Sequence, residues 1–566
     1  MSGQDFAQIG FYLLVLLAAV KPLGAYAARV YSDGNPPFDW VLGPVERIIY
    51  RAGGVTAKAE MTWKQYAFAL LAFNGAGFLA LYFSLRLQGL LPFNPRGFVG
   101  IEPHRAFNIT ASFVTNTNWQ NYGGETTLSY FSQMVGLTVQ NFVSAATGMA
   151  VLAALARGIA RRGTEMIGNF WVDLTRTTLH ILLPLSAMLT IALVSQGVVQ
   201  NLSDYRPATT LEGGQELLPM GPAASQIAIK QLGTNGGGFF NVNSAHPLEN
   251  PTPVSNLLQM LAILLIPTAL CYTFGRMVGD VRQGWALLAA MALVFVPCVL
   301  VTVWLESGAN PTLADLPIDQ GLGNMEGKET RFGVVNSALW GVSTTAASNG
   351  SVNSMHDSFT PLGGLVPMFL MQLGEVVFGG VGSGLYGMLM FVIFSVFLAG
   401  LMVGRTPEYL GKKVEAFEVK MASIAVLTPP AVVLLGAAIA TATPDGLSGV
   451  QEAGPHGLSE ILYAFSSMGN NNGSAFAGYG ANTPTTNMTG AIAMLAARYW
   501  VALPALAIAG SLAKKKLLPA GPGTLPTHSL LFIFFLSGVV VVVGALAFVP
   551  ALALGPIAEH LVVAGN

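Results

Sequence analysis

The segment LGTNGGGFFNVNS at residues 232–244 decides the fold that we expect, because three similar segments occur elsewhere in the chain. All four follow a semi-apolar stretch and are rich in Gly, Asn, Thr and Ser; the others are FVTNTNWQNYGG (113–124), VSTTAASNGSVNS (342–354) and FSSMGNNNGSAF (465–476). Aligned on Asn118, Gly236, Gly350 and Gly473, these segments recur at a spacing of about 120 residues, and a near-constant period of this kind indicates an internal repeat.

The composition places most of the chain in lipid. Of its 566 residues, 52% are hydrophobic and only 10% are charged, whereas soluble domains carry roughly 25% charged residues. The 27 Lys and Arg residues nearly balance the 28 Asp and Glu residues. This balance provides no basic face for nucleic acid and no acidic tail.

Ten apolar stretches are long enough to span a membrane, since about 20 helical residues cross the bilayer core. These stretches are 6–28, 66–85, 127–156, 177–197, 254–274, 283–304, 365–404, 421–442, 488–510 and 528–553. With the N-terminus outside, most Lys and Arg residues fall in inner loops, as the positive-inside rule requires. The sequence therefore predicts that both termini are extracytoplasmic.

The apolar run at 365–404 is about twice the length that one span needs. Two spans would place Arg405, Lys412, Lys413 and Lys420 outside, against the charge bias. The middle of the run reads GGVGSGLYG, so we predict one broken span instead. Its unwound backbone must be buried in protein or line water.

We therefore predict an all-α polytopic membrane protein with about ten transmembrane helices and four pseudo-symmetric helix–pore-loop–helix repeats around a central cation filter. Each repeat contains a span, a short re-entrant helix, a glycine-rich turn and a span. The expected segments are an N-terminal transmembrane helix with a cytoplasmic loop at 1–62, repeats at 63–160, 173–278, 282–404 and 418–512, and a C-terminal transmembrane helix at 525–566.

The turns have the composition of a cation site. Gly and Asn reach backbone conformations that direct carbonyl groups to one side, and carbonyl oxygens can replace the hydration shell of an ion. The C-terminal end of a preceding short helix adds attraction for a cation. Ordinary surface turns are the alternative, but four similar segments on the outer side favour a filter. The first segment has Asn118, Trp119 and Gln120 where the others have small residues, which predicts unequal quarters.

Charged residues inside apolar spans are costly and are often functional. Glu375 is expected either to attract cations below the filter or to pair with a neighbouring helix. Arg498 either limits ion exit or anchors the structure. The seven histidines show no clustered ligand spacing, which argues against a metal site. No Asp-Lys-Thr-Gly or Walker sequence occurs, so any ATP hydrolysis is expected in another chain.

Five blocks resemble the potassium-binding subunits (KdpA) of bacterial Kdp-type potassium-transporting ATPases, in the superfamily of potassium transporters. These blocks are LGTNGGGFFNVNSAHPLENPTP, TTAASNGSVNSMHDSFTPLGG, MFLMQLGEVVFGGVGSGLYGML, GRTPEYLGKKVE and YAFSSMGNNNGSAF. The resemblance implies a non-catalytic subunit that selects K+ for high-affinity uptake across the bacterial inner membrane. It implies no organic cofactor, and it implies three partners, which are a P-type ATPase subunit (KdpB), KdpC and a small KdpF peptide.

The resemblance also assigns roles to residues. It implies a potassium filter at Thr117, Asn118, Asn235, Gly236, Gly237, Asn349, Gly350, Asn472 and Gly473. It implies a conduction path or gate at Glu375, Arg405 and Arg498, with a tunnel that carries the ion sideways to the ATPase subunit. Two alternatives remain open at this point. One is a stand-alone potassium channel or cation symporter of Trk or Ktr type, and the other is a scaffold without ion conduction.

Overall fold

The computed structural model of the chain is almost entirely helical and describes residues 1–32, 36, 38–313, 316–404, 406–518 and 525–565. Within these ranges, ten helices are long and apolar enough to cross a membrane: Gly3–Val30, Trp63–Arg86, Ser132–Ala160, Phe170–Ser195, Pro253–Met277, Val281–Leu313, Ser383–Val403, Ala416–Ala442, Pro484–Lys514 and Leu530–Gly565. The predicted all-α polytopic fold is confirmed.

The helices are numbered in chain order. They are α1 (Gly3–Val30), α2 (Asp39–Ala52), α3 (Trp63–Arg86), α4 (Pro103–Val114), α5 (Gly124–Thr127), α6 (Val139–Ala160), α7 (Phe170–Arg176), α8 (Leu183–Ser195), α9 (Ala223–Leu232), α10 (Pro253–Met277), α11 (Val281–Glu306), α12 (Gly333–Ala346), α13 (Pro361–Gln372), α14 (Ser383–Val403), α15 (Ala416–Ala442), α16 (Pro444–Leu447), α17 (Pro455–Gly469), α18 (Pro484–Lys514), α19 (Leu530–Leu552) and α20 (Ala558–Gly565). Two small antiparallel hairpins pair β1 (Arg206–Thr209) with β2 (Gln215–Leu218) and β3 (Glu408–Tyr409) with β4 (Lys412–Lys413).

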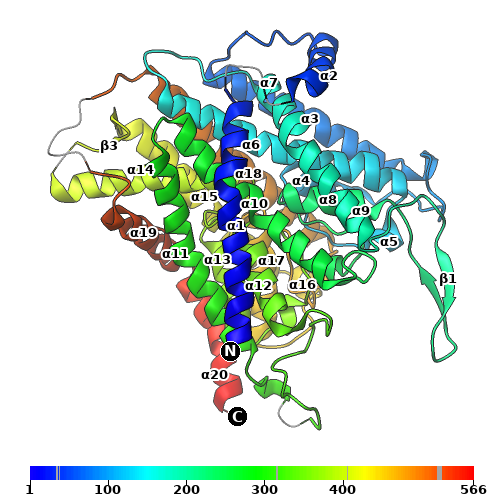
Figure 1. Ribbon diagram of the computed structural model, residues 1–566. Coiled ribbons are helices and arrows are strands. Elements are labelled where there is room, and N and C mark those ends of the chain that lie inside the picture. Colours follow the sequence, from blue (N-terminus) through cyan, green and yellow to red (C-terminus); the bar gives the residue numbers. More distant parts are fainter. Residues whose placement is uncertain (33–35, 37, 314–315, 405, 519–524, 566) are drawn as a thin grey trace.

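The order of long and short helices repeats four times. A short helix, α4, α9, α12 or α17, follows a long helix and leads directly into one of the four glycine-rich segments. A further helix then returns from the segment: α6, α10, α13 or α18. Helices α1 and α19 flank this set, and both chain termini lie at the same end of the molecule (Figure 1).

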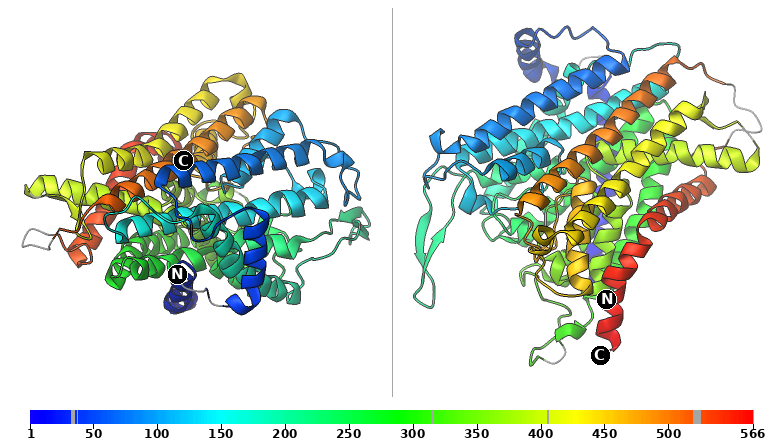
Figure 2. Two further views of the ribbon diagram at one scale, coloured as in Figure 1. Left: turned by 90° about the horizontal axis from the view of Figure 1, so that it is seen from above. Right: turned by 180° about the vertical axis from the view of Figure 1, so that it is seen from behind.

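The core is formed by the returning helices. Helices α6 and α10 are the most deeply buried of the long helices. Helix α1 packs along α10, and α15 packs along α18, where the yellow and orange helices run side by side in Figure 2. The lipid-facing sides of the outer helices expose large apolar residues, among them Phe68, Leu435 and Leu546.

Three of the returning helices begin with the same dipeptide. Helices α10, α13 and α18 each have a Thr at the N-cap position and a Pro at the first helical position, at Thr252-Pro253, Thr360-Pro361 and Thr483-Pro484. In all three, the Thr hydroxyl accepts a hydrogen bond from a backbone N–H of the first turn. Thr satisfies a free helix donor and Pro needs none, so the sequence specifies where each helix starts.

The predicted break lies between Gln372 and Ser383, where α13 ends and α14 begins. Its position differs in detail from the sequence prediction, because Gly384 and Gly387 lie within α14 and Glu375 lies inside the non-helical segment. The segment has left-handed backbone at Gly374 (φ 88°), Glu375 (φ 60°), Phe378 (φ 49°) and Gly382 (φ 81°), which a helix cannot contain.

The break lies against α6, and two glycines permit this approach. A Cβ atom on Gly148 of α6 would lie 2.6 Å from the Val381 carbonyl oxygen. A Cβ atom on Gly382 would lie 2.2 Å from the Gly148 carbonyl oxygen. Any larger residue at either position would separate the unwound segment from α6.

Candidate functional site

The four glycine-rich segments share one backbone path. Each has a central residue whose amide N–H donates to the carbonyl oxygen five residues earlier in the preceding short helix. The four bonds are Thr117 to Ser112 (2.9 Å), Asn235 to Lys230 (2.8 Å), Asn349 to Thr344 (2.9 Å) and Asn472 to Ser467 (2.8 Å). We refer to residues 116–118, 234–236, 348–350 and 471–473 as turns 1 to 4.

Each central residue lies between two left-handed residues. The residues before it are Asn116, Thr234, Ser348 and Asn471, with φ angles of 68°, 48°, 47° and 52°. The residues after it are Asn118, Gly236, Gly350 and Gly473, with φ angles of 52°, 79°, 85° and 105°. The four positions aligned from the sequence are thus equivalent in conformation, and Gly or Asn occupies each because these residues tolerate left-handed backbone.

The turns contact one another in a closed ring. A Cβ atom on Gly236 would lie 1.7 Å from the Asn349 carbonyl oxygen. The corresponding distances are 2.3 Å from Gly350 to the Asn472 oxygen and 2.1 Å from Gly473 to the Thr117 oxygen. Turn 2 therefore meets turn 3, turn 3 meets turn 4, and turn 4 meets turn 1. Only glycine lets the carbonyl of the next turn come this close.

Turn 1 closes the ring differently, as its divergent sequence predicts. Asn118 replaces the glycine, and its side-chain Nδ2 donates to Oδ1 of Asn141 in α6 at 2.6 Å. The same amide packs against the residue that follows turn 2, because a Cβ atom on Gly237 would lie 2.8 Å from Asn118 Nδ2. Three of the contacts between neighbouring turns thus bring a glycine against a carbonyl oxygen, whereas the contact between turns 1 and 2 involves the Asn118 side chain.

Asparagine amides connect neighbouring turns. Nδ2 of Asn349 donates to the Lys230 carbonyl at 3.2 Å, and Nδ2 of Asn472 donates to the Thr344 carbonyl at 3.0 Å. Sequence reasoning missed two further amides of this kind. Asn116 donates to the Thr234 carbonyl at 3.0 Å, and Asn471 donates to the Thr117 hydroxyl at 2.9 Å. The only signal for them was the high Asn content of the segments.

The surroundings of the ring suit a positive charge. Thr117, Asn235, Asn349 and Asn472 are fully buried, and none of the turns contains a charged residue. Helices α4, α9, α12 and α17 end immediately before the turns, so the partial negative charge of four helix C-termini is directed at the ring. Backbone carbonyls and helix ends together can replace part of the hydration shell of a monovalent cation.

Two buried ion pairs lie close to turns 2 and 3. Lys230 pairs with Glu249, and Lys328 Nζ lies 2.8 Å from Glu306, with all four side chains inaccessible to solvent. Lys230 lies in α9, and Lys328 lies in the segment between α11 and α12. Each is neutralised by a carboxylate from another element, and additional hydrogen bonds, such as Thr360 N–H to Glu306 at 2.8 Å, offset the desolvation of the pair.

Glu375 and Arg498 line one small cavity directly beneath turn 4, although they lie far apart in the sequence. Asn470, Asn471 and Tyr386 also line this cavity. Oε1 of Glu375 and Nη2 of Arg498 are buried without a hydrogen-bond partner among the described residues. The third residue assigned to the path, Arg405, lies outside the described residues.

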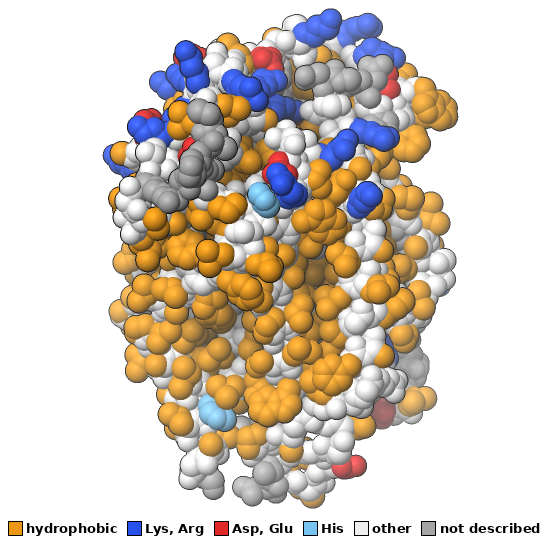
Figure 3. Space-filling view, turned by 60° about the vertical axis from the view of Figure 1, so that its left-hand side comes forward, with side chains coloured by type: hydrophobic (Ala, Val, Ile, Leu, Met, Phe, Trp, Pro, Cys, Tyr) orange, Lys and Arg blue, Asp and Glu red, His pale blue; other side chains and the backbone are white. Residues whose placement is uncertain are grey.

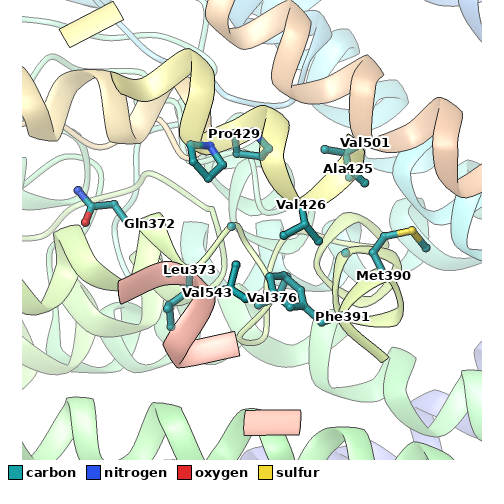
Figure 4. Close-up of a pocket in the computed structure, with 14 residues that line it drawn as sticks. Gln372, Leu373, Val376, Met390, Phe391, Ala425, Val426, Pro429, Val501 and Val543 are labelled. Carbon is teal, nitrogen blue, oxygen red and sulfur yellow. The ribbon is translucent and has the colours of Figure 1, made fainter. Parts of the chain in front are cut away.

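A second cavity adjoins the first and is mainly apolar (Figure 4). Gly374, Gly387, Pro429 and Val501 line both cavities. The remaining lining comes from the break after α13 and from α14, α15 and α19, with Val376, Phe391, Val426 and Val543 around the space. The break therefore separates a polar cavity under the ring from an apolar cavity toward α15 and α19.

Comparison with known proteins agrees with this architecture. The crystal structure of the potassium transporter TrkH from Vibrio parahaemolyticus superposes with a TM-score of 0.50, covering 88% of this chain and 97% of that chain at 16% sequence identity. At this level of sequence identity, the likeness shows a shared fold and nothing more.

Sequence relatives extend over the full length. Proteins named potassium-transporting ATPase potassium-binding subunit from Sorangium cellulosum, Herpetosiphon aurantiacus and Klebsiella pneumoniae are 64%, 62% and 60% identical to this chain, and the matches cover 99% of this chain in each case. They cover 99% of each relative as well. The model of the family described as KdpA, potassium-transporting ATPase A subunit, matches residues 10–561, and the chain belongs to this family.

Proposed function

We propose that this chain is the potassium-binding and translocating subunit of an ATP-driven potassium importer. The observation that carries the proposal is the closed ring in which Gly236, Gly350 and Gly473 each face a carbonyl oxygen of the next turn. The proposed K+ site comprises Thr117, Asn118, Asn235, Gly236, Gly237, Asn349, Gly350, Asn472 and Gly473. Potassium is the ion named for the relatives.

Exit from the ring follows the two cavities. In this proposal, K+ passes from turn 4 into the cavity lined by Glu375 and Arg498, where the carboxylate attracts the ion and the guanidinium limits its occupancy. The adjoining apolar cavity then leads toward α15 and α19. A sideways route of this kind fits transfer to a separate P-type ATPase subunit of KdpB type, with KdpC and KdpF as further partners, and Arg405 belongs to the gate.

The charge distribution supports an orientation in the membrane. Lys and Arg side chains gather at one end of the molecule (Figure 3), and both termini lie at the other end (Figure 1). By the positive-inside rule, the basic end is cytoplasmic and the termini are extracytoplasmic in the bacterial inner membrane. The repeat boundaries 63–160, 173–278, 282–404 and 418–512 complete the proposal.

Co-expression with the neighbouring ATPase subunits tests this function. The purified complex is expected to show K+-stimulated ATP hydrolysis, and Gly236→Asp is expected to abolish the stimulation because a carboxylate cannot fit the ring. Gly97→Asp is the matched control, since Gly97 also has a left-handed φ of 64° but has open space around its Cβ position.

Three outcomes contradict the proposal. Potassium flux through this chain alone, without associated ATPase activity, would support a channel or symporter. Unchanged potassium affinity in Gly236→Asp would support a scaffold. An equal loss in Gly236→Asp and Gly97→Asp would show that left-handed strain, and not the ring, causes the effect.

A further inference from the structure

Outside the ring, three acidic side chains surround one histidine. Asp357 lies in a short helical turn, His356–Ser358, that follows turn 3, whereas His456 and Glu460 lie at the start of α17 and Glu559 lies in α20. His456 Nε2 is 3.2 Å from Asp357 Oδ1, and His456 Nδ1 is 2.9 Å from Glu559 Oε1. One ligand atom from each of Asp357, His456 and Glu460 lies within 4.8 Å of the others.

Glu460 is buried and only half satisfied. Its side chain is completely buried, and its Oε2 accepts a hydrogen bond from the Gln451 N–H at 3.0 Å. Among the residues that the structure describes, its Oε1 has no hydrogen-bond partner. Across the described ranges of the chain, no Lys or Arg forms an ion pair with Asp357, Glu460 or Glu559. Three carboxylates thus share one imidazole, and a buried carboxylate oxygen without a partner is costly.

The free oxygen faces a small space beside Gly478. A Cβ atom on Gly478 would lie 2.4 Å from Glu460 Oε1 and 2.6 Å from Asp357 Oδ2. Oε1 of Gln451 lies 3.2 Å from the same point. Three oxygen atoms from three segments therefore converge where glycine provides no side chain.

We propose that Asp357, His456 and Glu460 bind one divalent metal ion of the Zn2+ or Mn2+ class. Carboxylate oxygens and an imidazole nitrogen are ligands for both ions. His456 would bind through Nε2, while Nδ1–H donates to Glu559. A carboxylate on the second nitrogen fixes the ring and is common behind metal-binding histidines.

The rival is a cluster that binds only a proton. Burial lowers the pKa of His456, but hydrogen bonds to Asp357 and Glu559 outweigh this effect and raise the pKa to about 10. An imidazolium would satisfy Asp357 and Glu559, yet it would leave Glu460 Oε1 without a partner. A metal ion would contact that oxygen as well and would displace the imidazole proton.

The bound ion would connect three parts of the chain. It would join the segment after turn 3, the helix that leads into turn 4, and the C-terminal helix α20. The metal would thereby hold α20 against α13 and α17, a structural role that does not depend on the transported ion.

The test uses the full-length chain in detergent, purified without a polyhistidine tag and treated with EDTA. Calorimetric titration with Zn2+, and separately with Mn2+, is expected to show one site per chain for at least one ion and a higher unfolding temperature. Asp357→Asn and Glu460→Gln are expected to weaken binding at least tenfold, because loss of a partner that only supports a metal ligand already costs roughly 10- to 100-fold. Glu452→Gln is the control, because Glu452 is exposed nearby.

Gly478→Ala keeps every ligand but places a methyl group between the oxygens, so it is also expected to weaken binding. Gly478→Ala still tests the site if Asp357→Asn and Glu460→Gln, which remove charges, impair folding. Absence of one-site binding to the wild-type chain overturns the proposal, as does equal affinity in Glu460→Gln, Gly478→Ala and Glu452→Gln. A wild-type unfolding temperature that responds to pH but to neither metal establishes the proton-only cluster instead.

Discussion

The ring of turns and the break after α13 are both unwound backbone inside a helical protein, but they are built in different ways. All four turns repeat the same hydrogen bond and the same pair of left-handed residues. The break occurs once: α6, α10 and α18 continue for 22, 25 and 31 residues, whereas α13 stops after 12.

The repeated turns and the single break suit two different requirements of the proposed ion pathway. A site that surrounds an ion needs similar groups on all sides, and repetition of one turn provides them. In the proposed function, a route out of the site needs a direction, and α13 of the third repeat is the one returning helix of the described structure that stops early. Glu375 lies in that opening and Arg498 faces it from the uninterrupted α18, so equivalent regions of two repeats contribute opposite charges.

The largest expected effect comes from Gly350→Ala, which tests the ring. The new Cβ would meet the Asn472 carbonyl oxygen at 2.3 Å, and the residue would keep a φ of 85°. Left-handed strain of about 1–2 kcal/mol and overpacking of about 1–3 kcal/mol predict a loss in K+ affinity of about 30-fold or more. Isothermal titration with K+ and Na+ measures this loss.

Gly97→Ala is the control for that prediction, because it adds the same strain at a position with open space (φ 64°). Its K+ affinity is expected to match the wild type. If both variants lose affinity equally, the contact between turns 3 and 4 is not what orders the site.

A smaller effect is expected from Glu375→Gln, which tests the break. The amide keeps the shape of the side chain but removes the negative charge from the cavity beneath turn 4. We expect K+-stimulated ATP hydrolysis and K+ uptake to fall by roughly tenfold, the effect of removing one charge from a partly desolvated path, with little change in K+ affinity of the ring. Glu212→Gln, in the exposed β1–β2 turn, is the control. Normal turnover in Glu375→Gln would remove this carboxylate from the mechanism.

The sequence predicted the turns better than it predicted their surroundings. Asn118, Gly236, Gly350 and Gly473 align by spacing alone, and the structure places all four in left-handed backbone. Local chemistry explains this success, because left-handed positions select Gly and Asn within the segment itself. The ion-binding role of these residues stays a prediction.

The failures concern contacts between distant segments. Lys230 and Lys328 form ion pairs with Glu249 and Glu306, which belong to other elements, and no pattern along the chain predicts such a pairing. The break was predicted at the glycine-rich middle of the apolar run, but α13 already ends at Gln372, so Glu375 lies inside the non-helical segment. The Thr-Pro pairs at the starts of α10, α13 and α18 are visible in the sequence and would have predicted where these helices begin.

The smallest effect on K+ affinity is expected from substitutions of the side chains that join the turns, because these leave the backbone carbonyls of the ring in place. Asn349→Ala keeps the carbonyl group but removes the amide, whose Nδ2 donates to the Lys230 carbonyl at 3.2 Å across the joint with turn 2 and whose Oδ1 accepts from the Ser351 N–H at 3.0 Å within its own segment. One such hydrogen bond contributes about 0.5–1.5 kcal/mol, so K+ affinity is expected to fall by about two- to tenfold. Asn472→Ala is expected to behave alike, because Asn472 makes the equivalent bond to Thr344.

Asn353→Ala is the control for both variants, because its buried amide bonds to Asn256 at 3.0 Å, away from the turns. It is expected to lower the unfolding temperature without changing K+ affinity. Asn118→Ala sharpens the comparison further, since its amide bonds to α6 through Asn141. The comparison uses the K+ affinities of the three variants. If the affinities of Asn349→Ala and Asn472→Ala differ more from each other than either differs from that of Asn118→Ala, the side chains of turns 3 and 4 are not equivalent. In that case only the backbone of the ring is repeated.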